Sequence, residues 1–281
     1  MPATRILLLT TLAMLAFTGN SLLCRIALRD TAIDASSFTA VRLVSGALVL
    51  WALVRLRARQ PLGGSWPGAL SLFVYAAGFS FAYRELAAGT GALLLFGAVQ
   101  LCMLSIGWLR GERLTGLQSL GLLLALAGMI TLLLPGASAP PLGAALLMVL
   151  AGAGWGIYSL LGRGAGDPLS ATAGNFVRAI PLALVLALVL LPTLRWDMPG
   201  LVYAVLSGAL TSGLGYAIWY SALPGLGALQ AATVQLSVPV LTALAGSLLL
   251  AEALTLRLLL AAIAVLGGIA LVLQVRRTAS R

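Results

Sequence analysis

The side chains that could carry chemistry in this sequence are neutral amides inside long apolar segments. Asn20, Gln100 and Gln235 each lie near the middle of such a segment. An amide can donate to a carboxylate and accept from an ammonium group, and a polar group facing lipid would be left unsatisfied. We therefore expect these amides to face an internal cavity that binds a small polar molecule.

Aromatic residues at helical spacing could form the wall of that cavity. Tyrosine or phenylalanine recurs every four residues from Tyr75 to Tyr83, which places all three rings on one helix face. Such stripes also occur in ordinary helix packing and in the aromatic belts of membrane proteins. The aromatic residues that we include in the predicted binding site are Phe79, Tyr83, Trp155, Tyr158 and Tyr216.

Two arginines lie within apolar segments, where a charge costs roughly 2.5 to 3.5 kcal/mol on insertion scales. We include Arg178 in the binding site, because it lies deeper and could attract a substrate carboxylate; the alternative is bonding to backbone carbonyls. Arg42 lies nearer the end of its segment, and a structural or gating role is predicted for it. The same role is predicted for Glu112, Pro239 and Glu252, the two acids as partners of nearby arginines.

The sequence lacks the residues that most enzymes and proton-coupled carriers need. It has no His, and none of its seven acids lies centrally in an apolar segment. This argues against paired-acid catalysis, a Ser/His/Asp triad and proton relay through buried carboxylates. Cys24 and Cys102 suggest neither a disulfide nor a metal site. We predict a protein that is not an enzyme and that binds no cofactor or metal.

Membrane-spanning helices must position these side chains. The 281 residues are 61% hydrophobic and 9% charged, with a mean hydropathy of +1.07, whereas soluble domains are roughly 25% charged. Crossing a bilayer takes about 20 apolar residues in a helix. The predicted fold class is therefore an all-α integral membrane protein with ten transmembrane helices, at 6–28, 36–54, 66–86, 89–109, 114–134, 142–162, 169–191, 200–222, 227–250 and 256–275.

The basic residues indicate the orientation of these spans. A net charge of +10 would suggest nucleic acid in a soluble protein, but here the arginines lie mostly between spans, where they determine topology and contact anionic lipid. More of them flank the inner ends of the spans if the N-terminus is inside. We expect a multi-pass protein of the inner (plasma) membrane, with both termini cytoplasmic and no nucleic-acid partner.

An internal repeat divides the chain into two halves. Residues 40–43 around Arg42 match residues 176–179 around Arg178, and Glu112 has its counterpart in Glu252. Each half holds an odd number of spans, so the second half enters the membrane from the opposite side. This pattern is typical of alternating-access transporters, although a duplicated scaffold without transport is an alternative. The predicted units are two inverted five-helix repeats around a central cavity, at 1–137 and 138–281.

Taken together, these features resemble the drug/metabolite transporter superfamily, in particular its EamA branch. The resemblance covers nearly the whole chain and rests on the arginines of the second and seventh spans, Gly-Glu-Arg-Leu after the fourth span with its echo at Glu252, Pro239, and the small residues of the fifth and tenth spans. It implies a basket-shaped bundle with a central substrate cavity, and the sequence is most similar in style to exporters of amino acids, including aromatic ones. One difference is that residues 98–100 read Ala-Val-Gln, where many relatives place a proline.

The expected function is therefore facilitative export of amino acids or similar small amphipathic metabolites. The cavity is expected between the first, third, fourth, sixth, eighth and ninth spans. A carrier for drugs, organic phosphates or nucleotide sugars is one alternative, although phosphates would favour paired cations deep in the cavity. An intramembrane lipid-metabolising enzyme is another, but it would need clustered acids or His. The expected partners are the small-molecule substrate and the lipid bilayer, and the protein is expected to be a monomer or homodimer.

Overall fold

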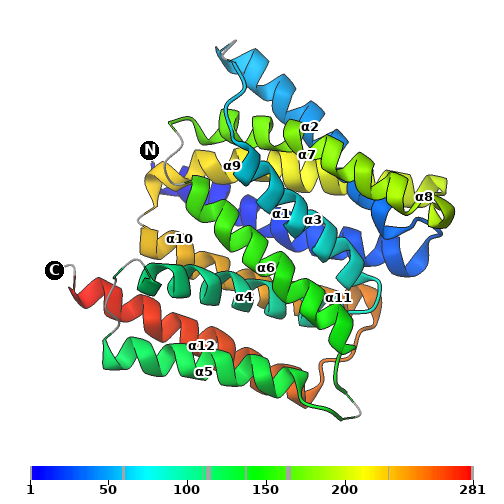
Figure 1. Cartoon of the computed structure of the whole chain (residues 1–281). Helices are drawn as coiled ribbons and strands as arrows, with labels where there is room; N and C mark the ends of the chain where they lie inside the picture. Colours follow the sequence, from blue (N-terminus) through cyan, green and yellow to red (C-terminus); the bar gives the residue numbers. More distant parts are fainter. Residues whose placement is uncertain are drawn as a thin grey trace.

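The protein is a bundle of long helices, shown by a computed structural model in Figure 1. The structure describes residues 2–58, 61–109, 111, 115–136, 138–162, 166–226 and 228–279, and within these ranges it contains no strand. The first half forms α1 (Ala3–Asp30), α2 (Ala35–Ala58), α3 (Trp66–Tyr83), α4 (Ala88–Leu109) and α5 (Gly116–Leu133).

The second half is more interrupted. Its sixth, seventh and tenth spans are single helices: α6 (Leu142–Gly162), α7 (Pro168–Val189) and α12 (Leu256–Ala279). The short turn η1 (Leu191–Thr193) follows α7. The eighth span is divided into α8 (Met198–Val205), η2 (Leu206–Leu214) and α9 (Gly215–Ala222), followed by the turn η3 (Leu223–Gly225). The ninth span consists of α10 (Ala228–Gln235) and α11 (Ser237–Leu250).

These helices confirm the predicted all-α membrane fold. Within the described part of the chain, nine helical stretches are long and apolar enough to cross a bilayer. The predicted third span is not one of the nine, because the Trp, Pro and Tyr residues of α3 lower its hydropathy. It is nevertheless packed against α6 and α7 inside the bundle.

Local capping explains where several helices begin. Ser65 accepts from the backbone N–H of Gly68 at the start of α3, and Asp167 accepts from that of Leu169 at the start of α7. Thr115 and Gln118 form a reciprocal capping box at the start of α5. Each cap satisfies a backbone donor that a helix leaves without an intrahelical partner.

Two irregular segments bring backbone close to the centre of the bundle. The segment η2 is wound as a π-helix, a form often found at functional sites, and a Cβ at its Gly208 would collide with Ser45 and the Arg42 carbonyl. In the ninth span the helix breaks at Leu236. Pro239 accounts for this break, since it offers no N–H to the carbonyl of Gln235 and its ring crowds that carbonyl.

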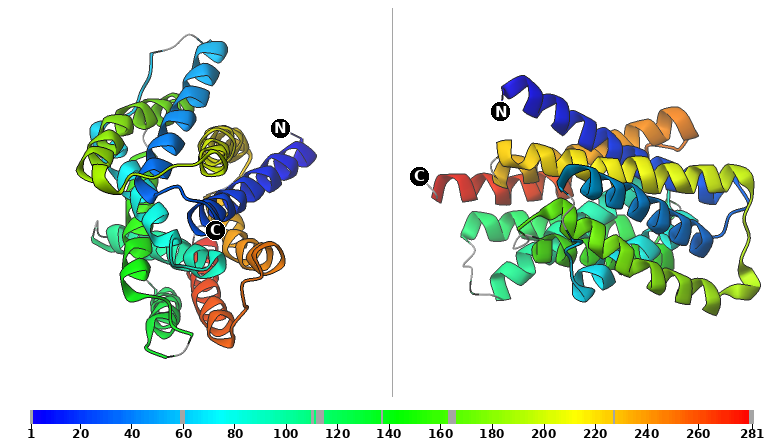
Figure 2. Two further views of the ribbon diagram at one scale, coloured as in Figure 1. Left: turned by 90° about the vertical axis from the view of Figure 1, so that its right-hand side faces the viewer. Right: turned by 90° about the horizontal axis from the view of Figure 1, so that it is seen from above.

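Helices from the two halves pack against each other throughout the bundle. α2 packs on α7, α4 on α11, and α5 on α12. In Figure 1 and the left view of Figure 2, α5 and α12 lie at the edge farthest from α2. The start of α1 and the end of α12 lie at the same end of the bundle.

Small residues allow α5 and α12 to approach closely. A Cβ added to Gly121 would lie 2.5 Å from the Gly268 carbonyl oxygen, and one added to Gly268 would lie 2.7 Å from the Ala125 nitrogen. The neighbouring Gly267 has open space around it. Backbone-to-backbone contact of this kind is a common basis of helix association in membranes.

We predict that Gly268→Leu destabilises the protein, while Gly267→Leu is tolerated. Leucine at 268 must push α12 away from α5, and overpacking of this kind typically costs about 1 to 3 kcal/mol. Thermal unfolding of the two variants in detergent measures the difference. Equal melting temperatures would contradict the packing described for this helix pair.

Candidate functional site

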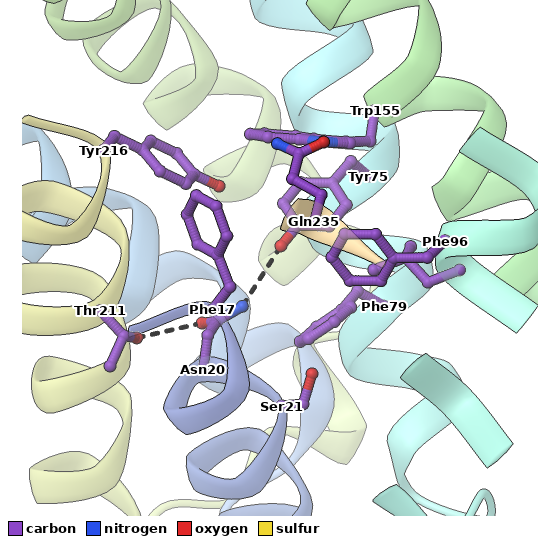
Figure 3. A pocket seen from close by; sticks show the side chains of 11 residues that line it. Phe17, Asn20, Ser21, Tyr75, Phe79, Phe96, Trp155, Thr211, Tyr216 and Gln235 are labelled. Atoms are coloured by element: carbon purple, nitrogen blue, oxygen red, sulfur yellow. Dashed lines mark hydrogen bonds between the residues drawn. The ribbon is translucent and has the colours of Figure 1, made fainter. Parts of the chain in front are cut away.

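A small cavity lies inside the bundle (Figure 3). Its volume is about 20 Å³, enough for about one water molecule and far below the roughly 300 Å³ or more of small-molecule pockets. In this conformation the cavity is therefore too small for a substrate, which can bind only if the walls move apart.

The cavity lies between the same six spans that the sequence predicts around it. Its walls come from α1, α3, α4, α6, η2, α9 and α10. The lining residues are Phe17, Asn20, Ser21, Tyr75, Phe79, Leu95, Phe96, Trp155, Thr211, Tyr216 and Gln235.

Aromatic rings dominate the walls. The Trp155 ring lies with its centroid 4.9 Å from that of Tyr75 and 5.2 Å from that of Tyr216. Phe17 meets Tyr216 edge to face at 5.9 Å, and Phe79 packs beside Tyr75 at 5.4 Å. Such a wall suits an apolar or aromatic group, and the faces of its rings attract cations.

A chain of hydrogen bonds crosses one side of the cavity. The Asn20 amide donates to the Tyr75 hydroxyl over 3.2 Å, and its oxygen accepts from Ser207 at 2.8 Å and from Thr211 at 3.3 Å. Figure 3 shows Asn20 between Thr211 and the Tyr75 hydroxyl. The chain joins α1, α3 and η2, and so connects the two halves of the protein.

Arg42 extends this chain from α2. Its Nη2 donates to the Tyr75 hydroxyl over 2.9 Å, and its guanidinium carbon lies 5.1 Å and 4.9 Å from the ring centroids of Tyr75 and Phe79. The residue is only 1% exposed, and its Nε and Nη1 have no hydrogen-bond partner among the described residues. Arg42, for which a structural or gating role is predicted, therefore lies directly behind the α3 wall of the cavity.

Arg178 is placed differently from what the sequence suggests. Its Nη1 donates to the carbonyls of Gly63 and Gly174, at 2.6 Å and 3.0 Å, and the residue does not line the cavity. Ser170 and Asn175 bond the same loop between α2 and α3, through the backbone N–H groups of Gly63 and Ser65. Arg178 thus holds the loop between α2 and α3 through backbone carbonyls, which is the alternative that the sequence analysis gave for it.

Tyr158 and Tyr83 lie behind the cavity walls rather than in them. Tyr158 stacks on Trp155 and donates to Thr172, whose hydroxyl in turn donates to Tyr220. The Tyr83 ring meets Phe79 edge to face, and its hydroxyl donates to the Ala88 carbonyl.

Four other predicted residues lie in different places. Gln235 lines the cavity, whereas Gln100 is buried one helical turn beyond Phe96 and does not line it. Pro239 is buried just after the break in the ninth span, and Glu112 lies outside the described residues. The prediction left out Tyr75, although it shares a helix face with Phe79. It also missed lining residues that nothing in their type or spacing distinguishes from packing residues: Phe17, Ser21, Leu95, Phe96 and Thr211.

An ion pair closes the bundle at the end opposite the N-terminus. Arg25 Nε lies 2.9 Å from Glu252 Oε1, and the same guanidinium donates to the carbonyls of Tyr83 and Arg84. The other Glu252 oxygen accepts from the Ala88 backbone N–H at 2.7 Å. This Arg25–Glu252 lock ties α1, the α3–α4 connection and the end of α11 together.

A wider hollow lies at the N-terminal end. Its volume is about 600 Å³, and it lies among the start of α1, the end of α2, the start of α7 and the end of α9. Arg5, Arg57 and Asp167 line it, together with Tyr220. Because Tyr220 is linked through Thr172 to Tyr158, these side chains form the layer between the hollow and the Trp155 wall of the cavity.

Three comparisons with known proteins bear on this site. Residues 142–274 match the model of the EamA-like transporter family. The chain is 66% identical over 278 residues to "Uncharacterized protein PA1977" of Pseudomonas aeruginosa, covering 98% of this chain and 97% of that protein. A solved structure described as "Crystal structure of protein" shares the fold, with a TM-score of 0.69, 21% identity and complete coverage of both chains.

We predict that Arg178→Gln lowers stability without changing ligand affinity. Losing charged hydrogen bonds to two carbonyls should reduce the free energy of unfolding by about 2 kcal/mol. Arg195→Gln makes the same charge change at an exposed position and serves as the control. Thermal unfolding and ligand titration of both variants test this. A fall in ligand affinity for Arg178→Gln but not for Arg195→Gln would contradict the prediction and show that Arg178 contributes to ligand binding.

Proposed function

Because this chain belongs to the EamA-like transporter family, we propose that it is an alternating-access carrier that exports amino acids or similar small amphipathic metabolites. It is a multi-pass membrane protein. The family implies a small-molecule substrate and a lipid bilayer as its partners. The observation that carries the proposal is the internal cavity, whose wall combines aromatic rings with the amides of Asn20 and Gln235.

The lining chemistry suits a molecule with one apolar side and two polar groups. The rings of Trp155, Tyr75 and Tyr216 can pack on an aromatic or aliphatic side chain and attract an ammonium group. Hydroxyl and amide groups can bind a carboxylate. Among the described residues that line the cavity there is no Asp, Glu or Arg, which favours a cargo of small net charge over a multiply charged phosphate.

The packing of the helices supports two inverted repeats, 1–137 and 138–281, as the moving units. In such an arrangement, spans that occupy equivalent places in the two halves face each other. The pairs α2 with α7, α4 with α11, and α5 with α12 meet this condition. The α3–α6 contact likewise has its counterpart in the packing of α1 against the eighth span. Equivalent units of opposite orientation can exchange conformations around a shared site.

The two ends of the bundle support a closed-outside conformation. The Arg25–Glu252 lock closes one end, while the other carries the hollow bordered by Arg5 and Arg57. We place the arginine-lined hollow in the cytoplasm of the cell and the lock at the outer face of the plasma membrane, in keeping with the positive-inside rule. Substrate would then enter through the hollow and leave after the lock opens.

Purified protein in liposomes should take up radiolabelled phenylalanine saturably. We expect the same rate with and without an imposed proton gradient, because no carboxylate lines the described cavity to carry a proton. Protein-free liposomes and excess unlabelled phenylalanine are the controls. Uptake that requires the gradient would contradict facilitative transport, and uptake of a sugar phosphate in place of amino acids would contradict the proposed cargo.

Glu252→Gln should make the outer end open more often. Cys24, next to Arg25 and fully buried, reports on this opening in a Cys102→Ser background. We expect an impermeant maleimide to label Cys24 about tenfold faster in the variant, which corresponds to a shift of about 1.4 kcal/mol toward the open state. Glu85→Gln, an exposed acid at the same end, is the matched control. Equal labelling rates in the two variants would show that the ion pair does not hold this end closed.

A further inference from the structure

Arg42 is a buried charge whose hydrogen-bonding capacity is only partly used. Its side chain is 1% exposed, and of its nitrogens only Nη2 has a hydrogen-bond partner among the described residues. No acid forms an ion pair with it within the described chain. A buried charge without an anionic partner is costly in a low-dielectric interior, so an anion that comes close to it would be strongly stabilised.

Its counterpart in the second half, Arg178, is only half-buried and is bonded to backbone carbonyls. Arg178 occupies the equivalent place in the seventh span and gives one nitrogen to two carbonyls. Arg42 instead points its charge at the rings of Tyr75 and Phe79, both of which line the cavity. The two arginines thus differ in where their charge lies: that of Arg42 faces the cavity wall, and that of Arg178 faces a loop.

Tyr75 connects this charge to the cavity. Its hydroxyl accepts from the Asn20 amide at 3.2 Å and from Arg42 Nη2 at 2.9 Å. A hydroxyl has two lone pairs and one proton, so with both lone pairs engaged it acts toward a ligand as a donor. Accepting from a guanidinium polarises the O–H bond and makes it a stronger donor than a free tyrosine.

We propose that Arg42, acting through the Tyr75 hydroxyl, makes this cavity selective for substrates that carry a carboxylate. Tyr75 is the group that touches the carboxylate, and Arg42 is a positioning and polarising residue behind it. The inference rests on the proposed function in that it takes this cavity as the substrate site. It adds that the carboxylate is the required feature of the cargo, while the ammonium group is dispensable.

Calorimetric titration of the purified protein with three matched compounds tests this selectivity. L-phenylalanine and 3-phenylpropanoate carry the carboxylate, and L-phenylalaninamide replaces it with a neutral amide. We expect the wild type to bind both carboxylates at least about tenfold more tightly than the amide. Equal affinity for phenylalanine and its amide, or no binding of either carboxylate, would overturn the proposal.

Two variants assign the selectivity to Arg42 and Tyr75. Arg42→Gln and Tyr75→Phe should each reduce the preference for carboxylate to below about twofold, against about tenfold in the wild type. Tyr203→Phe, which removes a hydroxyl on α8 away from the cavity lining, should keep the full preference. Retained preference in Tyr75→Phe overturns the proposal even if Arg42→Gln fails to fold.

Stability provides a second readout that separates this role from a structural one. Removing an uncompensated buried charge should leave the melting temperature of Arg42→Gln equal to or above that of the wild type. A marked fall would mean that the guanidinium serves to hold the helices together. The liposome assay separates the two proposals. Carboxylate-selective binding without transport would overturn the proposed transport function but not the role of Arg42 and Tyr75. Transport with unaltered carboxylate preference in both variants would overturn the role of Arg42 and Tyr75 but not the transport function.

Discussion

The hydrogen-bonded chain from Tyr75 through Asn20 to Ser207 is the interaction on which the rest of the structure depends. Inside a bilayer, polar groups must find partners within the protein, so this chain fixes how α1, α3 and η2 face one another. It also crosses between the two halves, as do the Arg25–Glu252 lock and the bonds of Asn175 and Arg178 to the loop between α2 and α3. The aromatic cavity lies beside this chain because α1 and α3 also contribute Phe17 and Phe79 to its wall, to which α6 adds Trp155.

The two ends of the bundle then determine which way the cavity can open. The lock of Arg25 and Glu252 is local and electrostatic, and it bridges elements far apart in the sequence. The opposite end is held by the layer that contains Tyr158, Thr172 and Tyr220. The cavity has room for about one water molecule, so the proposed alternating access requires each closure to open in turn. Close contacts such as that of Gly121 with Gly268 keep α5 and α12 together as a peripheral support.

The sequence was sufficient to predict most of the fold. The spans follow from the length of apolar segments, and their starts follow from caps such as Ser65 and Asp167. The six spans around the cavity were also predictable. Which face of a span turns inward was not: Gln235 lines the cavity and Gln100 does not, although both lie deep in their spans. The roles of Arg42 and Arg178 were equally hidden, because only tertiary packing brings the Gly63 carbonyl to one guanidinium and the Tyr75 hydroxyl to the other.

The central claim is that Arg42 acts on the substrate through Tyr75, and a double-mutant cycle tests it most directly. The measurement is the affinity for 3-phenylpropanoate of the wild type, Arg42→Gln, Tyr75→Phe and the double variant. If the two residues act as one unit, their effects do not add, and the double variant should bind no more weakly than the weaker single variant. Losses in binding free energy that simply add would show that the two residues act independently, and would contradict this account of the site.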